Sequence, residues 1–311
     1  MRRIRMPMRT APYVFLLPFL GLFFVFGLFP MLFSLFLAFQ SWEPTAGLGS
    51  MHYVGWSNFT FAITDEWFWK SFKNTLWLTL ASGVPQHLLA IPLACFIHTA
   101  FVRLRNLAVG VYFVPYITST VAIAIMFGSL FSTDYGLINQ GLQALARLPL
   151  IGAIFPQQNI DWINNPDNLK PVIAMIVFWR YVGFNIVLYL AALQTIPEDI
   201  YEAATMDGAN RLQQFFHITL PSLRPMIYFG VTLTLIGGLQ LFEEPFILTN
   251  GNGGSDQAGM TSAIYLYRMA FDFNDFGAAS AMSWILFVII ALLTYLTNRA
   301  FRERSNLKEA D

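Results

Sequence analysis

The chain has 311 residues, of which 56% are hydrophobic and only 12% are charged, and its 18 Lys and Arg residues balance its 18 Asp and Glu residues. A soluble domain of this size carries about a quarter charged residues, so the composition favours an integral membrane protein. The sequence contains no basic stripe with interleaved aromatic residues, which argues against nucleic-acid binding. The single cysteine, Cys95, has no second cysteine with which to form an internal disulfide.

Six apolar segments are long enough to cross a membrane as helices, which takes about 20 residues each. In chain order they cover about residues 13–39, 75–97, 107–131, 171–193, 226–248 and 277–300. The first apolar run follows basic residues, as a signal peptide does, but it is far longer than a signal core, so we expect a retained span. The segments predict an all-α integral membrane protein with short ends at residues 1–12 and 301–311.

The distribution of Lys and Arg predicts the orientation of these spans, because cytoplasmic segments carry the excess of both residues. With the N-terminus inside, twelve of them lie on the cytoplasmic side: Arg2, Arg3, Arg5, Arg9, Arg103, Arg105, Arg211, Arg224, Arg299, Arg302, Arg304 and Lys308. Five lie outside: Lys70, Lys73, Arg147, Lys170 and Arg268. We therefore expect both termini in the cytoplasm.

The segment 197–221, between the fourth and fifth spans, predicts two short cytoplasmic helices with a break between them. Pro197 suits the start of a helix, and the acidic residues that follow it suit the positive end of the helix dipole. Gly208 can adopt the positive φ that ends a helix. Four residues at helical spacing then give the second helix an apolar face: Leu212, Phe215, Phe216 and Thr219.

This segment resembles the signature of binding-protein-dependent ABC permeases: Glu-Ala-Ala, a Gly six residues after the Glu, and then Ile-x-Leu-Pro. The resemblance implies the six-span fold of type I ABC importers, in which the segment is a coupling helix that docks in a cytoplasmic ATPase. The coupling residues that it implies are Glu202, Ala203, Ala204, Asp207, Gly208, Ala209, Ile218, Leu220 and Pro221. The alternative, an ordinary amphipathic loop, would not match at so many positions.

The resemblance extends along the whole chain and is closest to carbohydrate permeases, specifically the first of the two membrane subunits in the maltose-type class. It is supported by the segments 53–59, 74–75 and 246–251, although the loop 251–255 lacks the Gly-Gly-Pro that is frequent in the family. It implies a multi-pass protein of the bacterial cytoplasmic membrane that imports a di- or oligosaccharide. The implied partners are a second homologous permease subunit, a dimer of ATPase subunits and an extracytoplasmic solute-binding protein.

The chain has no ATP-binding loop of its own, because none of Lys70, Lys73, Lys170 and Lys308 follows a glycine. We therefore expect no catalytic residue and no cofactor here, with ATP and Mg bound by the partner ATPase. A metal site is not expected either. His87 and His98 share a helix face but would lie about 16 Å apart, too far for one ion.

Ionisable residues inside a span are candidates for function, and three of them, Arg180, Glu243 and Glu244, lie in the fourth and fifth spans. At 1.5 Å per residue Arg180 would lie about 13 Å below the outer end of its helix, and Gln240 and Glu243 about 12 and 8 Å below theirs. Helical spacing would bring two stripes to one polar cavity, where aromatic faces stack on sugar rings and polar groups bond hydroxyls.

The predicted solute-binding residues are Val177, Arg180, Tyr181, Phe184, Gln240, Glu243 and Glu244, with Trp179 and Asn185 as secondary candidates. The resemblance implies sugar contacts at equivalent points of these two spans. In an alternative interpretation Arg180 only pairs with Glu243 or Glu244 and fixes helix packing. Glycerol-phosphate esters are an alternative solute class. An ion-driven secondary transporter is a different class altogether, and it would need an ion site and internal symmetry that the sequence lacks.

Overall fold

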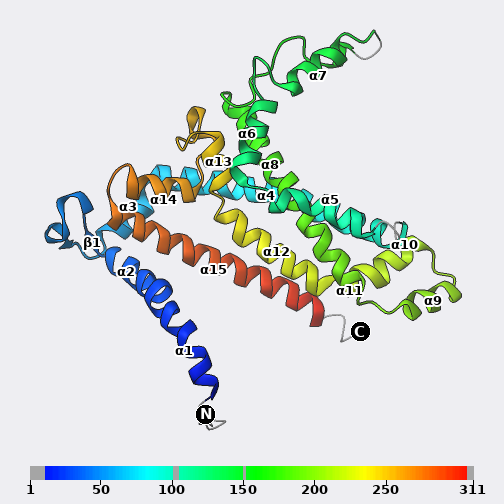
Figure 1. Cartoon of the computed structure of the whole chain (residues 1–311), viewed down its shortest axis with the longest axis horizontal. Helices are drawn as coiled ribbons and strands as arrows, with labels where there is room; N and C mark the ends of the chain where they lie inside the picture. The colour runs from blue at the N-terminus through cyan, green and yellow to red at the C-terminus, as the bar shows by residue number, and fades with distance from the viewer. Residues whose placement is uncertain (1–10, 101–104, 150–151, 307–311) are drawn as a thin grey trace, which may run out of the picture. The chain divides into compact units, whose positions relative to one another are not determined.

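The computed structural model describes residues 11–100, 105–149 and 152–306 (Figure 1). Arg2, Arg3, Arg5, Arg9, Arg103 and Lys308, which contribute to the predicted orientation, lie outside the described residues. The helices are α1 (Ala11–Phe23), α2 (Phe29–Leu37), α3 (Ser57–Thr64), α4 (Glu66–Ala100), α5 (Arg105–Ile117), α6 (Thr120–Leu130), α7 (Leu137–Ala146), α8 (Pro166–Leu193), α9 (Glu198–Met206), α10 (Arg211–Gln214), α11 (Leu220–Ser222), α12 (Arg224–Leu239), α13 (Glu243–Leu248), α14 (Ser262–Phe271) and α15 (Phe276–Asn306). Two short strands, β1 (Gln40–Ser41) and β2 (His52–Tyr53), are the only ones in the described part, so the predicted all-α class is confirmed.

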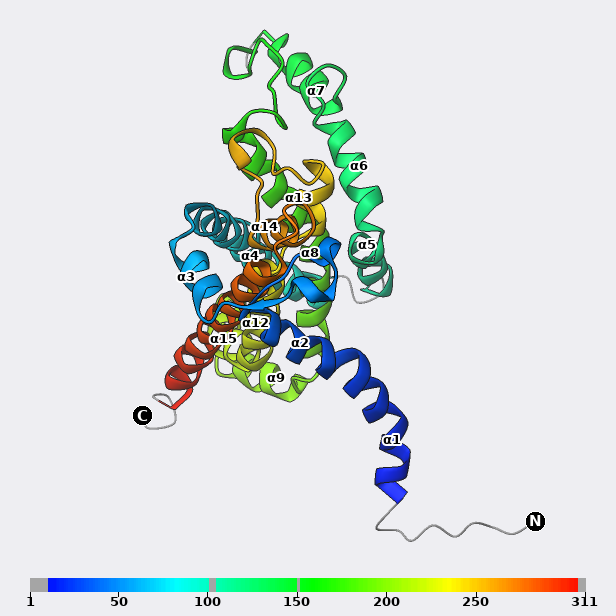
Figure 2. The same cartoon turned by 90° about the vertical axis from the view of Figure 1, so that its left-hand side faces the viewer.

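The described residues contain five stretches that are long and apolar enough to cross a membrane, or six if a sharply bent pair of helices counts as one span. The five are Tyr13–Leu37, Glu66–Thr99, Pro166–Leu193, Arg224–Leu248 and Phe276–Phe301. The bent pair is α5 and α6, which meet at 90° (Figures 1 and 2). The first stretch joins α1 to α2 through a π-helical turn, Phe24–Leu28.

The third predicted span, 107–131, corresponds to the bent pair α5 and α6 and not to one straight helix. Its break lies at Ser119, whose ψ of 128° leaves the helical region. The chain around the break is rich in groups that compete with helical hydrogen bonds. Pro115 lacks an N–H, and the Thr118 hydroxyl donates to the Val114 carbonyl at 2.7 Å. Hydropathy does not detect these local effects, because it measures only how apolar the segment is.

The fifth predicted span, 226–248, is also interrupted, between α12 and α13. Phe242 there has φ −130° and ψ −58°. In a continuous helix the residue at 245 would donate its N–H to the Leu241 carbonyl, but Pro245 has no N–H. The Thr261 hydroxyl donates to that carbonyl instead, at 2.7 Å. Gln240 and Glu243 consequently do not share one helix face, contrary to the stripe predicted from a continuous helix.

The chain divides into two compact units, which are described separately: Met1–Phe68 with Leu266–Val288, and Trp69–Tyr265 with Ile289–Asp311. In the first unit, β1 and β2 pair antiparallel. The Asn58 side-chain amide donates to the carbonyls of Ala38 and Gln40 at 3.0 and 2.8 Å, which holds α3 against the end of α2.

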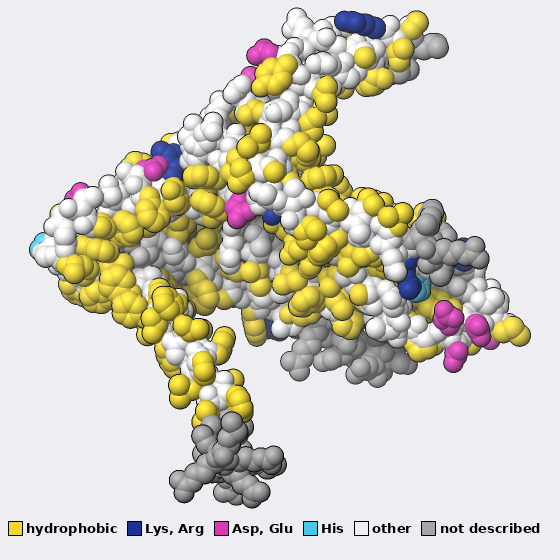
Figure 3. Space-filling model, viewed as in Figure 1, with side chains coloured by type: hydrophobic (Ala, Val, Ile, Leu, Met, Phe, Trp, Pro, Cys, Tyr) yellow, Lys and Arg dark blue, Asp and Glu magenta, His cyan; other side chains and the backbone are white. Residues whose placement is uncertain are grey.

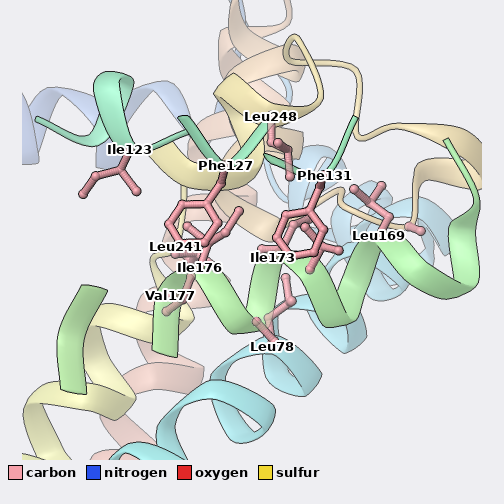
Figure 4. Close-up of a cluster of buried hydrophobic side chains, with 13 residues drawn as sticks. Leu78, Ile123, Phe127, Phe131, Leu169, Ile173, Ile176, Val177, Leu241 and Leu248 are labelled. Carbon is pink, nitrogen blue, oxygen red and sulfur yellow. The ribbon is translucent and has the colours of Figure 1, made fainter. Parts of the chain in front are cut away.

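The core of the second unit is built around α8. Side chains of α4, α6 and α13 gather against one stretch of it, with Phe127 and Phe131 lying beside Ile173 and Val177 (Figure 4). A second cluster joins the C-terminal half of α4 to the C-terminal half of α8. Within a membrane such packing stabilises through van der Waals contact and close backbone approach, because lipid tails are as apolar as the side chains. Gly183 is such a point, since a Cβ there would overlap the Tyr112 carbonyl oxygen of α5.

Candidate functional site

A cavity of about 240 Å³ lies in the second unit, where α4, α5, α8 and α12 meet. Its lining residues are Ser82, Gln86, Tyr116, Val177, Tyr181, Phe184, Asn185, Leu233, Thr234, Gly237, Gly238 and Leu241. Three of the predicted solute-binding residues are among them, namely Val177, Tyr181 and Phe184. The secondary candidate Asn185 also lines the cavity. The helical spacing on α8 thus identifies the face of that helix that lines the cavity.

One wall of the cavity is aromatic. The Tyr116 ring stacks on Phe184 with centroids 4.8 Å apart and meets Tyr181 edge-on at 5.9 Å. Tyr116 belongs to α5 and the other two rings to α8, so the wall is shared between two spans. Such rings offer flat apolar faces that stack against a sugar ring or another flat ligand.

A second wall presents polar groups in a determined orientation. The Gln86 amide donates to the Val177 carbonyl at 3.3 Å, which leaves its oxygen to accept from Asn185 Nδ2 at 3.1 Å. The same Asn185 nitrogen donates to the Tyr181 carbonyl at 3.3 Å. Rotating either amide by 180° would set like atoms against each other, so this arrangement is the consistent one.

The orientation leaves Asn185 Oδ1 as an acceptor without a hydrogen-bond partner among the described residues. Asn185 is only 2% exposed, so water does not readily satisfy this atom from the surface. Buried polar atoms are nearly always hydrogen-bonded. Asn185 thus lines the cavity and holds a buried acceptor that has no partner among the described residues.

Arg180 forms an ion pair beside this cavity instead of lining it. Its Nη1 lies 2.6 Å from Glu244 Oε1 and 3.8 Å from Glu243 Oε2. The Arg180 and Glu244 side chains are 12% and 3% exposed, whereas Glu243 is 62% exposed and accepts a 2.5 Å bond from the Thr120 hydroxyl. The pairing considered as an alternative for Arg180 is thus present, with Glu244 as the buried partner. Arg180 also lies over the Tyr181 ring at 5.2 Å.

Arg180, Gln240, Glu243 and Glu244 are absent from the cavity lining, and their role as solute contacts stays a prediction. The polar and aromatic lining residues that the sequence did not predict are on other helices: Ser82 and Gln86 of α4, Tyr116 of α5, and Thr234 of α12. A usable signal existed for Gln86, because a polar side chain inside an apolar span is itself uncommon. The spacing within one helix gives no indication of which residues of another helix face it.

The segment 197–221 has the predicted two-part form. α9 ends at Met206, and Gly208 follows with φ +82°, the positive value expected of it. A capping box between Asn210 and Gln213 then starts α10, and a π-helical turn, Phe215–Thr219, continues to α11. The two parts are tied by a 2.9 Å bond between the hydroxyls of Tyr201 and Thr219.

The predicted coupling residues divide by exposure. Glu202, Ala203, Asp207 and Gly208 are exposed, while Ala204, Ala209, Ile218, Leu220 and Pro221 are half-buried. Acidic side chains gather over α9 (Figure 3), and the apolar face predicted for the second helix is open at Leu212 and Phe216, which are 68% and 54% exposed. The segment therefore offers both charged and apolar groups to a partner.

Known proteins match this chain over most of its length. A family model described as "Binding-protein-dependent transport system inner membrane component" matches residues 87–304. The arabinooligosaccharides transport system permease protein AraP of Bacillus subtilis (strain 168) is 33% identical, over 93% of this chain and 88% of its own length. The lactose transport system permease protein LacF of Rhizobium radiobacter is 34% identical, over 94% of each chain.

The fold also matches a solved structure. A chain of a bacterial ABC transporter involved in the import of the acidic polysaccharide alginate superposes with a TM-score of 0.79 and 25% sequence identity. The superposition covers 95% of this chain and 96% of that one. The likeness therefore extends over nearly the whole chain.

Proposed function

The chain belongs to the family of inner-membrane components of binding-protein-dependent transport systems, and from this premise we propose that it is a permease subunit of a bacterial ATP-driven importer of a di- or oligosaccharide. Relatives named for arabinooligosaccharides and lactose, and a structural neighbour that imports alginate, support a sugar as the solute. The inner membrane of a bacterium is the location that goes with the family.

The observation that carries the proposal is the cavity with its aromatic wall and with Asn185, whose buried Oδ1 has no hydrogen-bond partner among the described residues. A sugar ring has apolar C–H faces that stack on Tyr116 and Phe184, and hydroxyls that donate to an amide oxygen. At about 240 Å³ the cavity is smaller than typical ligand pockets of roughly 300–1,000 Å³. It suits one ring of the solute at a time, as expected of a passage.

The energy for transport comes, in this proposal, from an ATPase dimer that binds ATP and Mg and docks on the segment 197–221. Exposed Glu202, the turn at Gly208 and open Leu212 and Phe216 are the docking groups. ATPase closure moves the segment and switches the accessible side of the cavity, which requires that the docked state be favoured differently in the two conformations. A second permease subunit and an extracytoplasmic binding protein complete the importer.

The pairing of Arg180 bears on the alternative solute class. A phosphate ester would need an uncompensated cation, but Arg180 is already neutralised by Glu244 at 2.6 Å, and Glu243 adds a further negative charge nearby. The local charge therefore disfavours an anionic solute and favours a neutral one such as a sugar.

The test uses the whole importer, with its second permease, ATPase and binding protein, reconstituted in liposomes. The binding protein is screened against sugars by thermal shift, and uptake of the hit is then measured with Asn185→Leu and, as control, Gln194→Leu. Gln194 is an exposed amide at the end of the same helix. We expect Asn185→Leu to lower uptake about tenfold, the cost of one hydrogen bond of ~1.4 kcal/mol, and the control to leave it unchanged. Equal uptake in both variants, or a binding protein that takes no sugar, would contradict the proposal.

A further inference from the structure

We propose that His87 and Tyr189 hold the hydroxyl of Thr234 in one orientation, so that Thr234 always donates a hydrogen bond into the cavity. His87 and Tyr189 are positioning residues in this arrangement, and Thr234 is the group that meets the solute. The proposal rests on the proposed function for the identity of the solute, but the hydrogen-bond arrangement itself can be measured independently.

The three side chains form a continuous chain of hydrogen bonds across three helices. His87 of α4 lies with Nδ1 2.6 Å from the Tyr189 hydroxyl of α8 and with Nε2 3.0 Å from the Thr234 hydroxyl of α12. Tyr189 is 0% and His87 9% exposed. Gly230, one turn before Thr234, leaves room for the ring pair, because a Cβ there would come within 2.9 Å of the Tyr189 hydroxyl.

The burial of these three side chains determines the charge of the imidazole ring of His87. Its two nitrogens contact two hydroxyls, and among the described residues no carboxylate lies within hydrogen-bond distance of the ring. An imidazolium would be a buried charge without a counterion, which is strongly unfavourable. The ring is therefore neutral and carries a single N–H.

The fully buried Tyr189 hydroxyl then decides which nitrogen carries that hydrogen. If Nδ1 carried it, Nδ1 would donate to Tyr189, and the tyrosine O–H hydrogen would have no acceptor among the described residues. If Nε2 carries it, Tyr189 donates to Nδ1 and Nε2 donates to Thr234. Only this second arrangement satisfies both donors, and leaving a buried donor unsatisfied costs its full desolvation penalty.

The Thr234 hydroxyl, having accepted from His87, is left with its own hydrogen. Threonine and serine in helices usually donate it to the carbonyl four residues before, as Thr75, Thr79 and Ser82 do here. Among the bonds of the described residues, Thr234 makes none of this kind, and it lines the cavity. Its hydrogen is thus available to a bound molecule.

The cavity accordingly offers one oriented donor, Thr234 Oγ1, and is also lined by Asn185, whose buried Oδ1 has no partner among the described residues. Solute hydroxyls can accept from Thr234 and donate to Asn185, whereas an ether oxygen can only accept and a C–H group does neither. A site that is built to bond a hydroxyl discriminates strongly against analogues that lack it, because its own buried groups are then left unpaired. The hydrogen bonds from Tyr189 to His87 and from His87 to Thr234 therefore favour solutes whose rings carry hydroxyl groups.

The first experiment measures the tautomer by solid-state ¹⁵N NMR of the ¹⁵N-histidine-labelled complex in lipid. The signals missing from His87→Gln assign the ring. We expect the neutral Nε2–H form, and a shift toward a mixture of tautomers in Tyr189→Phe. A neutral Nδ1–H form or a doubly protonated ring in the unsubstituted protein would overturn the assignment, whatever the solute is.

The second experiment is a double-mutant cycle in the reconstituted importer, with radiolabelled lactose, maltose and arabinobiose as probes. We expect Tyr189→Phe and Thr234→Val each to lower uptake about tenfold through KM, Thr234→Ser to retain it, and the double variant to be no worse than Thr234→Val. Tyr135→Phe, at a tyrosine that is 68% exposed, is the control and should not change uptake.

Additive losses in the double variant, or normal uptake in Thr234→Val, would overturn the positioning role. If the unsubstituted importer takes up none of the probes, the failure belongs to the proposed sugar specificity, and the NMR result still decides the hydrogen-bond arrangement.

Discussion

The Arg180 guanidinium and the Glu244 carboxylate meet at 2.6 Å and join α8 to α13 at the point where the fifth span is broken. Glu243 and Glu244 lie in the first turn of α13, where the helix dipole favours negative charge. Thr120, the first residue of α6, donates to Glu243. Both interrupted spans therefore contribute a helix start to one polar cluster, which connects the third, fourth and fifth spans.

We expect Glu244→Gln to destabilise the protein by about 3–5 kcal/mol, because it leaves the Arg180 charge buried without its main partner. Glu243→Gln should cost far less, since that side chain is 62% exposed and lies 3.8 Å from Arg180. Thermal unfolding of the two variants in the same detergent measures the difference. Equal midpoints for the two variants would show that the buried pair is not what stabilises this cluster.

Gly208 should tolerate no side chain without loss of coupling. Its φ of +82° is a conformation that L residues rarely adopt, so we expect Gly208→Asp to distort the turn and abolish uptake and substrate-stimulated ATP hydrolysis. Ligand capture by the binding protein should stay intact. Gly141→Ala, at a helical glycine with open space around it, is the control. Normal transport in Gly208→Asp would contradict the coupling assignment.

Gly183 allows α5 and α8 to approach closely, and a Cβ there would overlap the Tyr112 carbonyl oxygen. Because a backbone atom cannot move aside as a side chain does, we expect Gly183→Ala to destabilise the protein by about 1–3 kcal/mol. Gly110→Ala, on α5 with nothing within 4 Å, should be neutral or slightly stabilising. The midpoints of thermal unfolding in detergent compare the two, and similar values would mean that α5 and α8 are separated more widely.

The loop before α8 should loosen in acid. The backbone N–H of Asn164 donates to the Asp161 carboxylate and is the main reason that the pKa of Asp161 lies below its usual 3.8. The Thr133 hydroxyl donates to the same carboxylate. A lowered folded pKa means stability that is present above about pH 3.8 and is lost as the pH falls through the folded value. Hydrogen exchange at Asn164 should therefore accelerate below pH 3.8, and Asp161→Asn should show the same fast exchange at neutral pH. Exchange that does not depend on pH after correction for the intrinsic rate would contradict this.

The sequence predicts those features that depend on neighbours along the chain. Hydropathy locates the apolar stretches, and the motif around Glu202 and Gly208 predicts the two-part segment with its positive φ. On α8 the i, i+3, i+4, i+7 spacing identifies a cavity face that includes Val177, Tyr181 and Phe184. Each of these rests on helical periodicity or on local turn chemistry.

What the sequence did not predict depends on contacts between distant segments. The break at 240–242 is stabilised by Thr261, which is twenty residues away. Gln86 and Thr234 reach the cavity only because α4 and α12 pack against α8 in one particular register. The predicted stripe of Gln240, Glu243 and Glu244 requires an uninterrupted helix, whereas the helix is broken at Phe242, before α13.

Because the Thr261 hydroxyl donates to the Leu241 carbonyl, the fifth span can bend at the break before α13 at a low cost in free energy. Turning the chain there exchanges one side-chain hydrogen bond, about 0.5–1.5 kcal/mol, whereas unwinding a continuous helix would disrupt several successive backbone bonds. Leu241 also lines the cavity. The cavity wall at Leu241 can therefore be turned by a local rotation, while α12 before it stays helical.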